Sequence, residues 1–265
     1  MDVAGLFSLS GRVAVVTGGY RGIGRMIAEG LLGAGCARVY ITGRKAEPLE
    51  AAAADLGERC IAIPGDISTM DGIAALAEAL AAREERLDIL VNNAGAAWGA
   101  EFERFPENGW DRTIDLNLKT PFFLTQQLYP LLRAGGAERP AKVIMIASID
   151  GQKVNPWETY AYQASKAGLI HLTRRMAARL VKDNIVVNAI APGFFPSQMN
   201  RVAGNPPEEL LAAVPARRMG QAEDMAAAAI YLAARGGDYV VGTTLTVDGG
   251  IVNAAMPEEF PDAGG

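Results

Sequence analysis

Histidine is almost absent from this chain of 265 residues, because His171 is its only histidine. A Ser-His-Asp hydrolase site or a histidine-rich metal site would have to use this one residue. His171 lies in an apolar helical pattern, which predicts a packed or surface helix residue. Cysteine is also scarce, and Cys36 and Cys60 lack the spacing of metal ligands. The sequence therefore argues against hydrolases and zinc enzymes, and it predicts no metal site.

Basic charge and long hydrophobic runs are missing as well. The chain has 25 lysines and arginines against 30 aspartates and glutamates, a net charge of −5, so we expect no nucleic acid as a partner. The longest apolar runs, such as Met225 to Ala234, have about ten residues, whereas a membrane span needs about 20. No lysine or arginine precedes Arg12, which does not fit a signal peptide. We therefore expect a cytoplasmic protein without a membrane span.

The rest of the composition is that of a globular protein, with 50% hydrophobic and 21% charged residues. No linker or repeat divides the chain, so we expect one domain over residues 1–265. Short apolar segments alternate with helical patterns, which is typical of a parallel sheet covered on both faces. The pattern predicts an α/β, doubly wound Rossmann fold with a seven-stranded parallel sheet. The expected strands are Arg12–Thr17, Arg38–Thr42, Cys60–Ile63, Leu87–Val91, Val143–Ala147, Ile185–Ile190 and Thr244–Val247, with helices at Ile23–Ala34, Leu49–Leu56 and Ile73–Arg83 among others.

A glycine-rich segment directly follows the first expected strand. Gly18 permits a tight turn, and Gly22 and Gly24 let the backbone approach a pyrophosphate and let the helix pack on the strand. The helix that begins here offers free N–H groups and the positive end of its dipole to phosphates. Because a strand precedes and a helix follows, we predict a dinucleotide site. A purely structural turn is the minor alternative.

Four further motifs follow in order along the chain. They are Asn92–Gly95, Tyr162–Lys166, Pro192–Gly193 and Asp248–Gly250. Together with the Gly-x-x-x-Gly-x-Gly turn, this set resembles the short-chain dehydrogenase/reductase family over nearly the whole chain. Within that family, the chain is most similar to 3-oxoacyl-thioester reductases, those of the rhamnolipid pathway among them. The resemblance implies an oxidoreductase that interconverts a carbonyl and a secondary alcohol.

The residues after the second expected strand indicate which nucleotide binds. An NAD site usually has an acidic residue about 20 positions past the glycines, but this region has Gly43, Arg44 and Lys45. Gly43 leaves space, Arg44 suits a 2′-phosphate, and Arg21 supplies a second positive charge. We therefore predict NADP(H), against the alternative that these cations only solvate a loop. The resulting cofactor-binding set, part of it implied by the resemblance, is Gly18, Tyr20, Arg21, Gly22, Ile23, Gly24, Arg44, Asp66, Ile67, Asn93, Ala94, Gly95, Tyr162, Lys166, Pro192, Gly193 and Phe195.

Tyr162 and Lys166 are four residues apart in a helical pattern, which places them on one face of the helix. A tyrosine can protonate the oxygen that becomes charged when a carbonyl accepts a hydride. A lysine ammonium nearby is expected to lower the pKa of that tyrosine. Tyr160 has no such partner, because Ala164 lies four residues further on. We therefore predict Tyr162 as the acid and base of the reaction.

Two more catalytic residues are implied by the resemblance. Ser148 resembles the serine that donates a hydrogen bond to the substrate oxygen, and its alternative role is to cap its own loop. Asn117 matches the asparagine that holds a water linking Lys166 to solvent, and without the resemblance it is an ordinary helix residue. The 14 positions from Ser148 to Tyr162 are one more than the family usually has. We therefore expect a bulge in the substrate-side loop, which holds Trp157 and Glu158.

Two segments near the C-terminus are expected to be irregular. Residues 194–215 are predicted to form a substrate lid lined by Phe194, Phe195 and Met199, because ligands bind beyond the carboxyl ends of strands in such sheets. A plain surface connection is the alternative. Residues 256–265 are expected to be a loose tail or an arm toward a partner subunit. The resemblance implies a homotetramer, with a dimer as the alternative.

The substrate stays open at this point. The resemblance favours a 3-oxoacyl thioester reduced by NADPH. Reductases that dock acyl carrier protein resemble one another in an arginine before the sixth strand, where this chain has Asp183, and an acid would repel that acidic partner. A coenzyme A thioester, a gluconate-like sugar acid, a polyol or another secondary alcohol are alternatives. So is a non-catalytic module that senses NADP(H), although the complete Ser-Tyr-Lys-Asn set argues against it.

Overall fold

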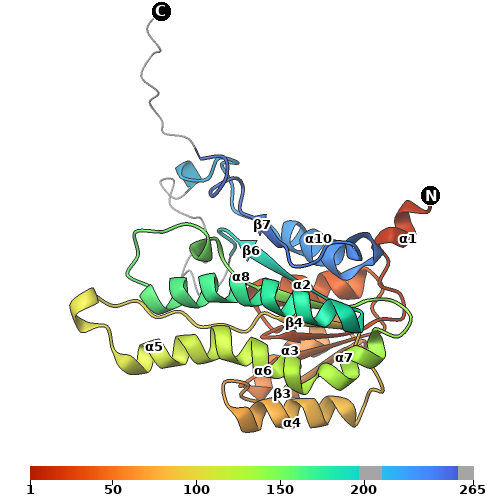
Figure 1. Ribbon diagram of the computed structural model, residues 1–265. Helices are drawn as coiled ribbons and strands as arrows, with labels where there is room; N and C mark the ends of the chain where they lie inside the picture. Colours follow the sequence, from red (N-terminus) through yellow and green to blue (C-terminus); the bar gives the residue numbers. More distant parts are fainter. Residues whose placement is uncertain (197–210, 256–265) are drawn as a thin grey trace, which may run out of the picture.

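The computed structural model describes residues 1–196 and 211–255. Figure 1 shows helices above and below a central sheet, with the short helix α1 (Val3–Phe7) at one end of the molecule. The segment that leads into α5 (Glu107–Ile114) projects beyond the sheet at the opposite end. Asp2 caps α1, because its carboxylate accepts the N–H of Gly5 at 3.0 Å.

The sheet formed by the described residues has seven strands in the order β3-β2-β1-β4-β5-β6-β7. Every neighbouring pair is parallel, so each strand is followed by a crossover that returns the chain to the same edge. This arrangement confirms the predicted doubly wound Rossmann fold. The strands are β1 (Val13–Thr17), β2 (Arg38–Gly43), β3 (Cys60–Pro64), β4 (Ile89–Asn92), β5 (Ala141–Ile146), β6 (Ile185–Pro192) and β7 (Thr244–Val247).

The ends of several elements differ from the expected ones, for tertiary reasons. β5 begins at Ala141 rather than Val143, because the charged Lys142 is buried within the strand with its Nζ 2.7 Å from the carboxylate of Asp238. A sequence pattern that treats lysine as a surface residue therefore starts this strand two positions too late. The helix expected to begin at Ile73 begins three residues earlier, because Thr69 caps it through the N–H of Gly72 at 3.1 Å.

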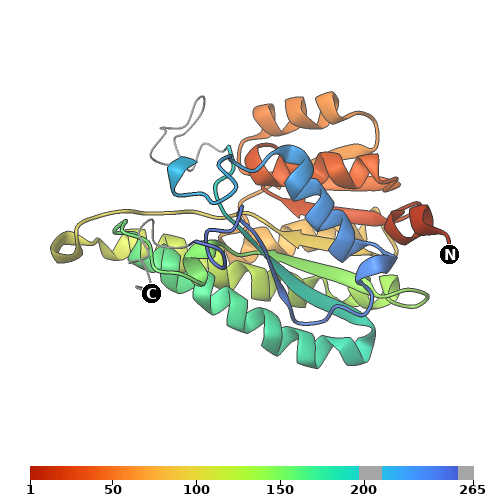
Figure 2. The ribbon, with the colours of Figure 1, turned by 90° about the horizontal axis from the view of Figure 1, so that it is seen from above.

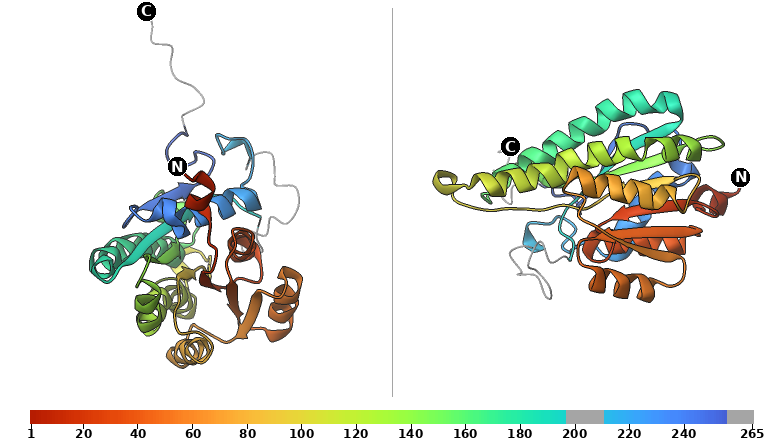
Figure 3. Two further views of the ribbon diagram at one scale, coloured as in Figure 1. Left: turned by 90° about the vertical axis from the view of Figure 1, so that its right-hand side faces the viewer. Right: turned by 90° about the horizontal axis from the view of Figure 1, so that it is seen from below.

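Helices cover both faces of the sheet (Figures 2 and 3). The helices α2, α3 and α10 pack against one face, and α4, α6, α7 and α8 pack against the other. Within residues 1–196 and 211–255, none of the helices is both long and apolar enough to span a membrane. Their bounds are α2 (Gly22–Gly33), α3 (Ala46–Leu56), α4 (Met70–Ala81), α6 (Thr120–Gln127), α7 (Tyr129–Gly135), α8 (Tyr160–Leu180) and α10 (Ala222–Ala233).

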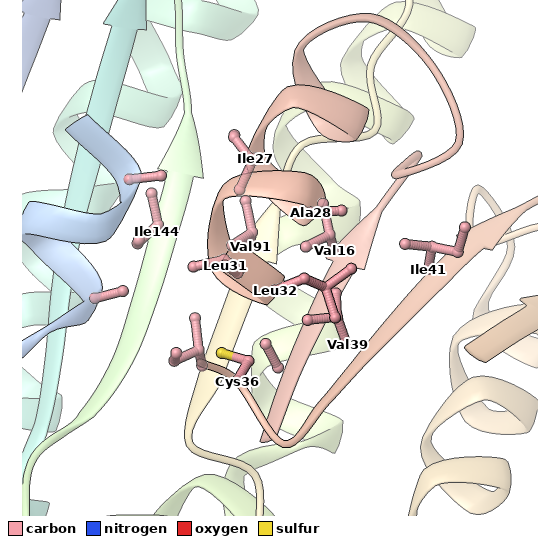
Figure 4. Packing of buried hydrophobic residues seen from close by; sticks show 14 of the residues in the cluster. Val16, Ile27, Ala28, Leu31, Leu32, Cys36, Val39, Ile41, Val91 and Ile144 are labelled. Carbon is pink, nitrogen blue, oxygen red and sulfur yellow. The ribbon is translucent and has the colours of Figure 1, made fainter. Parts of the chain in front are cut away.

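Two hydrophobic cores result, one on each side of the sheet. Successive residues of a strand point to opposite faces, so Val16 enters one core while Val15 enters the other. Figure 4 shows the first core, in which Ile27 and Leu31 of α2 lie beside Val91 of β4. All five of these side chains are fully buried. Burial on both faces explains why the strands read as continuous apolar runs.

The functional motifs gather at the carboxyl edge of the sheet. β1 and β4 are neighbours in its middle, and the strand order runs outward in opposite directions from them. Such a switch point leaves a crevice beyond the carboxyl ends of the strands, where ligands bind. The glycine turn follows β1, the Asn92–Gly95 motif overlaps the end of β4, and Ser148 follows β5.

Candidate active site

The glycine turn has the backbone that its sequence predicts. Gly18 has φ +64° and Gly22 has φ +52°, in the left-handed region that favours glycine. A Cβ on Gly24 would lie 2.4 Å from both the carbonyl oxygen of Gly18 and Nδ2 of Asn93. Only a glycine therefore fits at position 24. The first turn of α2 comes directly behind this glycine backbone, which is the arrangement that cradles a pyrophosphate.

A threonine ties the glycine turn to the next motif. Thr17 ends β1, and its Oγ1 accepts the N–H groups of Asn93 and Ala94, both at 2.9 Å. In return, Nδ2 of Asn93 donates to the carbonyl oxygen of Thr17 at 2.7 Å. The predicted residues Asn93 and Ala94 thus lie against the glycine turn, as expected. The sequence analysis missed Thr17, whose only signal was its place at the end of the first strand.

Cations line a hollow beside the glycine turn. Arg21, Arg44 and Lys45 come together there, as predicted, and they are joined by Arg25 of α2. Arg25 forms an ion pair with Asp55 of α3, and neither of these two residues was predicted. Helical spacing from Arg21 gave the signal for Arg25, because residues four apart share a face.

We expected Gly43 to leave space for a 2′-phosphate, but a side chain fills that space. A Cβ on Gly43 would lie 2.8 Å from the ring of Tyr20, so the tyrosine ring occupies the room that the glycine leaves. The guanidinium of Arg21 lies 5.1 Å from the centre of the same ring. Gly43 therefore positions Tyr20 and Arg21 rather than leaving open space for a phosphate.

Asp66 and Ile67 follow β3 at the same edge of the sheet. The Asp66 carboxylate accepts the N–H and the hydroxyl of Ser68 at 3.1 and 2.7 Å. Burial opposes ionisation, but these bonds and the charge of Arg44 lower the pKa of Asp66. The carbonyl oxygen of Ile67 accepts the hydroxyl of Thr120 at 2.9 Å. Both predicted residues are thus held in place by contacts just after β3.

The predicted catalytic side chains meet beyond β5. Nζ of Lys166 lies 5.6 Å from the centre of the Tyr162 ring and donates to the carbonyl oxygen of Ile146 at 2.7 Å. The side chain of Ser148 hydrogen-bonds with the Tyr162 phenol. Residues from one strand end and one helix therefore form a single cluster, and Tyr160 lies outside it in contact with Phe102.

The pKa values in this cluster differ from the sequence-based expectation. Burial raises the pKa of Tyr162 to about 12, although the hydrogen bond with Ser148 opposes this shift. Burial lowers the pKa of Lys166 to about 8, against the charge of Asp150. We expected Lys166 to lower the pKa of Tyr162, but burial of the phenol is the largest cause acting on this pKa, and it raises it. The sequence could not give this result, because it contains no measure of burial.

Asn117 lies on an unusual helix segment. It belongs to a π-helical turn, Asp115–Lys119, between α5 and α6, and such turns are frequent at functional sites. Its amide accepts the N–H of Ala96 at 2.8 Å and donates to the carbonyl oxygen of Ala96 at 2.9 Å and to Ser165 at 3.0 Å. Asn117 thus connects the segment after β4 to α8. Its role in holding a water stays a prediction.

The remaining two motifs pack on each other. A Cβ on Gly193 would lie 2.7 Å from Cα of Asp248, so glycine is required for this contact. The Asp248 carboxylate accepts the N–H groups of Gly250 at 2.8 Å and Val252 at 2.7 Å. The turn after β7 therefore supports the segment after β6 that begins with Pro192.

The substrate side is only partly within the described residues. The rings of Trp157 and Phe194 meet edge to face at 6.0 Å, so the substrate-side loop and the start of the expected lid are in contact. Phe195 is buried against Gly220 rather than exposed. Met199 and the rest of the lid at 197–210 lie outside the described residues, as does the predicted tail at 256–265.

The structure also places two residues that the sequence singled out, Asp183 and His171. Asp183 forms an ion pair with Arg179, one turn earlier, so a cation already lies beside its negative charge. His171 is exposed on α8, away from the catalytic cluster. It is therefore a surface helix residue, as its sequence pattern indicates.

The sheet order, the glycine turn and the Ser-Tyr-Lys cluster together define a dinucleotide-binding oxidoreductase. The family model described as "Enoyl-(Acyl carrier protein) reductase" matches residues 18–252. The rhamnolipids biosynthesis 3-oxoacyl-[acyl-carrier-protein] reductase of Pseudomonas aeruginosa is 49% identical over 254 residues, which cover 92% of this chain and 97% of that protein. The chain therefore belongs to the short-chain dehydrogenase/reductase family, as the sequence motifs predict.

Two further comparisons bear on ligands. The solved structure of the Pseudomonas aeruginosa RhlG/NADP active-site complex has a TM-score of 0.90 and 48% identity, and the match covers 94% of this chain and 99% of that one. The 2-dehydro-3-deoxy-D-gluconate 5-dehydrogenase of Escherichia coli is 39% identical, over 92% of this chain and 96% of that protein. The first relative agrees with the predicted cofactor, and the second is an enzyme of the class that the sequence left as an alternative.

Proposed function

We propose that the protein uses NADPH in the cytoplasm to reduce a 3-oxoacyl thioester to a secondary alcohol, with Tyr162 as the proton donor. The observation that carries the proposal is the cluster of Ser148, Tyr162 and Lys166, which lies beyond β5 at the sheet edge that also holds the glycine turn. The similarity to the Pseudomonas 3-oxoacyl reductase supports the choice of substrate.

The residues present fit an NADP molecule. Its pyrophosphate would lie against the glycine backbone where a Cβ on Gly24 has no room. Its 2′-phosphate would meet Arg21, Arg44 and Lys45 in the cationic hollow. When bound, NADPH supplies the hydride that the carbonyl carbon accepts.

The protein supplies the proton and holds the oxygen. Because the pKa of Tyr162 is raised to about 12, its phenol stays protonated at neutral pH and is ready to donate as negative charge develops on the substrate oxygen. Ser148, which hydrogen-bonds with this phenol, is placed to donate to the same oxygen. The ammonium of Lys166 then stabilises the tyrosinate that remains.

The test is a turnover assay with acetoacetyl-CoA, followed by the loss of NADPH absorbance, with NADH in parallel. We expect turnover with NADPH in the parent protein and a loss of at least about 100-fold in Tyr162→Phe, the usual contribution of general acid catalysis. Binding of NADPH, measured by its fluorescence, is expected to persist in the variant. Full activity of Tyr162→Phe would exclude the mechanism.

A second candidate function is the oxidation of a gluconate-like sugar acid or polyol with NADP⁺. The observation in its favour is the 39% identity to the Escherichia coli gluconate-type dehydrogenase. The same three catalytic residues would serve it, because the chemistry is the reverse of carbonyl reduction. NADP⁺ reduction by gluconate, without turnover of acetoacetyl-CoA, would favour this candidate.

We also propose that the protein assembles as a homotetramer. The described residues leave large apolar side chains on the surface, with Trp110 and Phe122 each about 40% exposed and Tyr239 fully exposed. Exposed apolar groups of this size are typical of association surfaces. A dimer is the alternative assembly.

A further inference from the structure

The cationic hollow beside the glycine turn contains an acid among its cations. Of the described residues that line the hollow, Arg21, Arg25, Arg44 and Lys45 carry positive charge and Asp55 alone carries negative charge. A carboxylate in a place that receives a phosphate opposes its binding, because like charges repel each other. The hollow therefore suits a 2′-phosphate best when the charge of Asp55 is neutralised.

Arg25 is the residue that neutralises this acid. Its guanidinium forms an ion pair with the carboxylate of Asp55, and the side chains of the two residues are 37% and 65% exposed. The backbone N–H of Arg25 donates to the carbonyl oxygen of Arg21 at 3.2 Å, and residues four apart share one face of a helix. Arg25 thus lies next to Arg21 on the same side of the hollow and contacts the acid from there.

The acid belongs to the face of α3 that lines the hollow. Pro48, Ala51 and Ala52 precede Asp55 on this face, with the three- and four-residue spacing of neighbours on a helix. These residues are uncharged, so Asp55 is the charged group that α3 presents to the hollow. An ion pair as exposed as that of Arg25 and Asp55 contributes little to stability, so linking α2 to α3 is a weak reason for it.

From this placement we propose that Arg25 is a specificity-determining residue for the nucleotide. It adds a fourth cation to those that face the 2′-phosphate, and it shields that phosphate from the charge of Asp55. NADH carries a neutral 2′-hydroxyl at the same position, so both effects act on NADP(H) alone. The inference rests on the cofactor of the proposed function and does not depend on its substrate.

The experiment measures binding of two small probes that differ only in the 2′-phosphate. Adenosine 2′,5′-bisphosphate carries it and adenosine 5′-phosphate lacks it, and both are titrated calorimetrically into the full chain. We expect the ratio of their affinities to fall about tenfold in Arg25→Gln, because one attraction is lost and the repulsion by Asp55 is no longer shielded. Binding of adenosine 5′-phosphate should stay within about twofold of the parent value.

A double-variant cycle separates shielding from a structural link between the helices. Asp55→Asn in the parent should change the ratio less than about twofold, because Arg25 already neutralises the acid, whereas the same change in Arg25→Gln should restore about threefold. A structural link would be lost in all three variants and would leave the ratio unmoved. An unchanged ratio in Arg25→Gln, or no recovery in the double variant, would overturn the proposal.

Glu50→Gln is the matched control for the loss of an acid. Glu50 is exposed and lies on the same helix α3, but it does not line the hollow. The ratio should therefore keep the parent value in this variant, and a shift as large as that in Arg25→Gln would show that any change of charge nearby has the effect. The difference between the parent and Arg25→Gln should also shrink in about 0.5 M KCl, since salt screens exposed charges.

The outcomes keep this inference apart from the proposed function. If the parent fails to reduce acetoacetyl-CoA while the ratio falls in Arg25→Gln and recovers in the double variant, the proposed substrate is wrong and the role of Arg25 stands. If the parent reduces acetoacetyl-CoA and the ratio does not change, the role of Arg25 is wrong and the proposed function stands. A parent that binds both probes equally well would overturn the inference whatever its activity.

Discussion

Burial acts in opposite directions on the two ionisable residues of the catalytic pair. Removal from water disfavours charge, so it raises the pKa of Tyr162 to about 12 and lowers that of Lys166 to about 8. At neutral pH the tyrosine therefore keeps its proton. The lysine loses its proton as the pH rises through about 8. The shift of Tyr162 keeps the phenol protonated, as reduction requires, whereas the shift of Lys166 limits the pH range in which its ammonium can stabilise the tyrosinate.

The lysine shift predicts a pH dependence. Because the pKa of Lys166 is lowered from 10.5 to about 8, its ammonium is lost as pH rises through about 8. We expect the rate of ketone reduction to fall above that pH, since the neutral amine no longer stabilises the tyrosinate. Steady-state rates between pH 6 and 10 measure this. The control is Lys166→Arg, which stays charged over the range, and its rate, however low, should lack the fall.

A second prediction at this scale concerns the choice of nucleotide. Arg44 lies in the cationic hollow with Arg21 and Lys45, where a 2′-phosphate would gain from each charge. We expect Arg44→Asp to weaken NADPH binding at least about tenfold and to leave NADH binding within a few-fold, because the new acid repels the phosphate alone. Fluorescence titration of both nucleotides measures the ratio of affinities, and an unchanged ratio would exclude a role for Arg44.

Among the elements, β5 contains the largest departure from a simple hydrophobic pattern. Lys142 is 1% exposed in the middle of this strand, and its Nζ lies 2.7 Å from a carboxylate oxygen of Asp238, beyond α10. The pair connects the strand to the segment that leads into β7. A buried ion pair adds little over apolar packing, but breaking it leaves an unpaired charge.

This asymmetry predicts different outcomes for two substitutions. Asp238→Ala should lower the free energy of unfolding by about 2 kcal/mol, below the full cost of an unpaired buried charge because Asp238 is partly exposed. Lys142→Met, which keeps the volume without a charge, should cost less. Urea denaturation of both variants measures the difference. Equal losses would show that the ion pair itself stabilises the fold.

At the scale of the whole molecule, the fold places chemistry on the edge of a rigid sheet. The cofactor residues come from the segments after β1, β2 and β3, and the catalytic residues come from the end of β5 and from α8. The two sets meet because β1 and β4 are neighbours at the centre of the sheet. Segments far apart in the sequence are therefore brought to one edge, as with Thr17 and Asn93, which lie 76 positions apart.

Assembly is the prediction that belongs to this scale. If the exposed apolar groups at Trp110, Phe122 and Tyr239 are covered by other copies of the chain, light scattering during gel filtration should give four times the mass of one chain. A mass of two chains would indicate the dimer, and a monomer at micromolar concentration would contradict the proposal.

The sequence by itself determined the order of strands and helices, the glycine turn and the catalytic candidates. These follow from local rules, since periodicity, glycine placement and four-residue spacing act over short stretches of chain. Tyr162 and Lys166 were found in this way and Ser148 through the family resemblance, and the structure brings the three together. The exact ends of β5 and α4 were not, because a buried lysine and a capping threonine depend on distant or detailed contacts.

Only the tertiary structure decided the electrostatics. Burial reversed the expected pKa shift of Tyr162, the ring of Tyr20 filled the space at Gly43, and Arg25 and Asp55 met across two helices. The physical reason is that desolvation and Coulomb forces depend on distances in space, which a sequence read residue by residue does not contain.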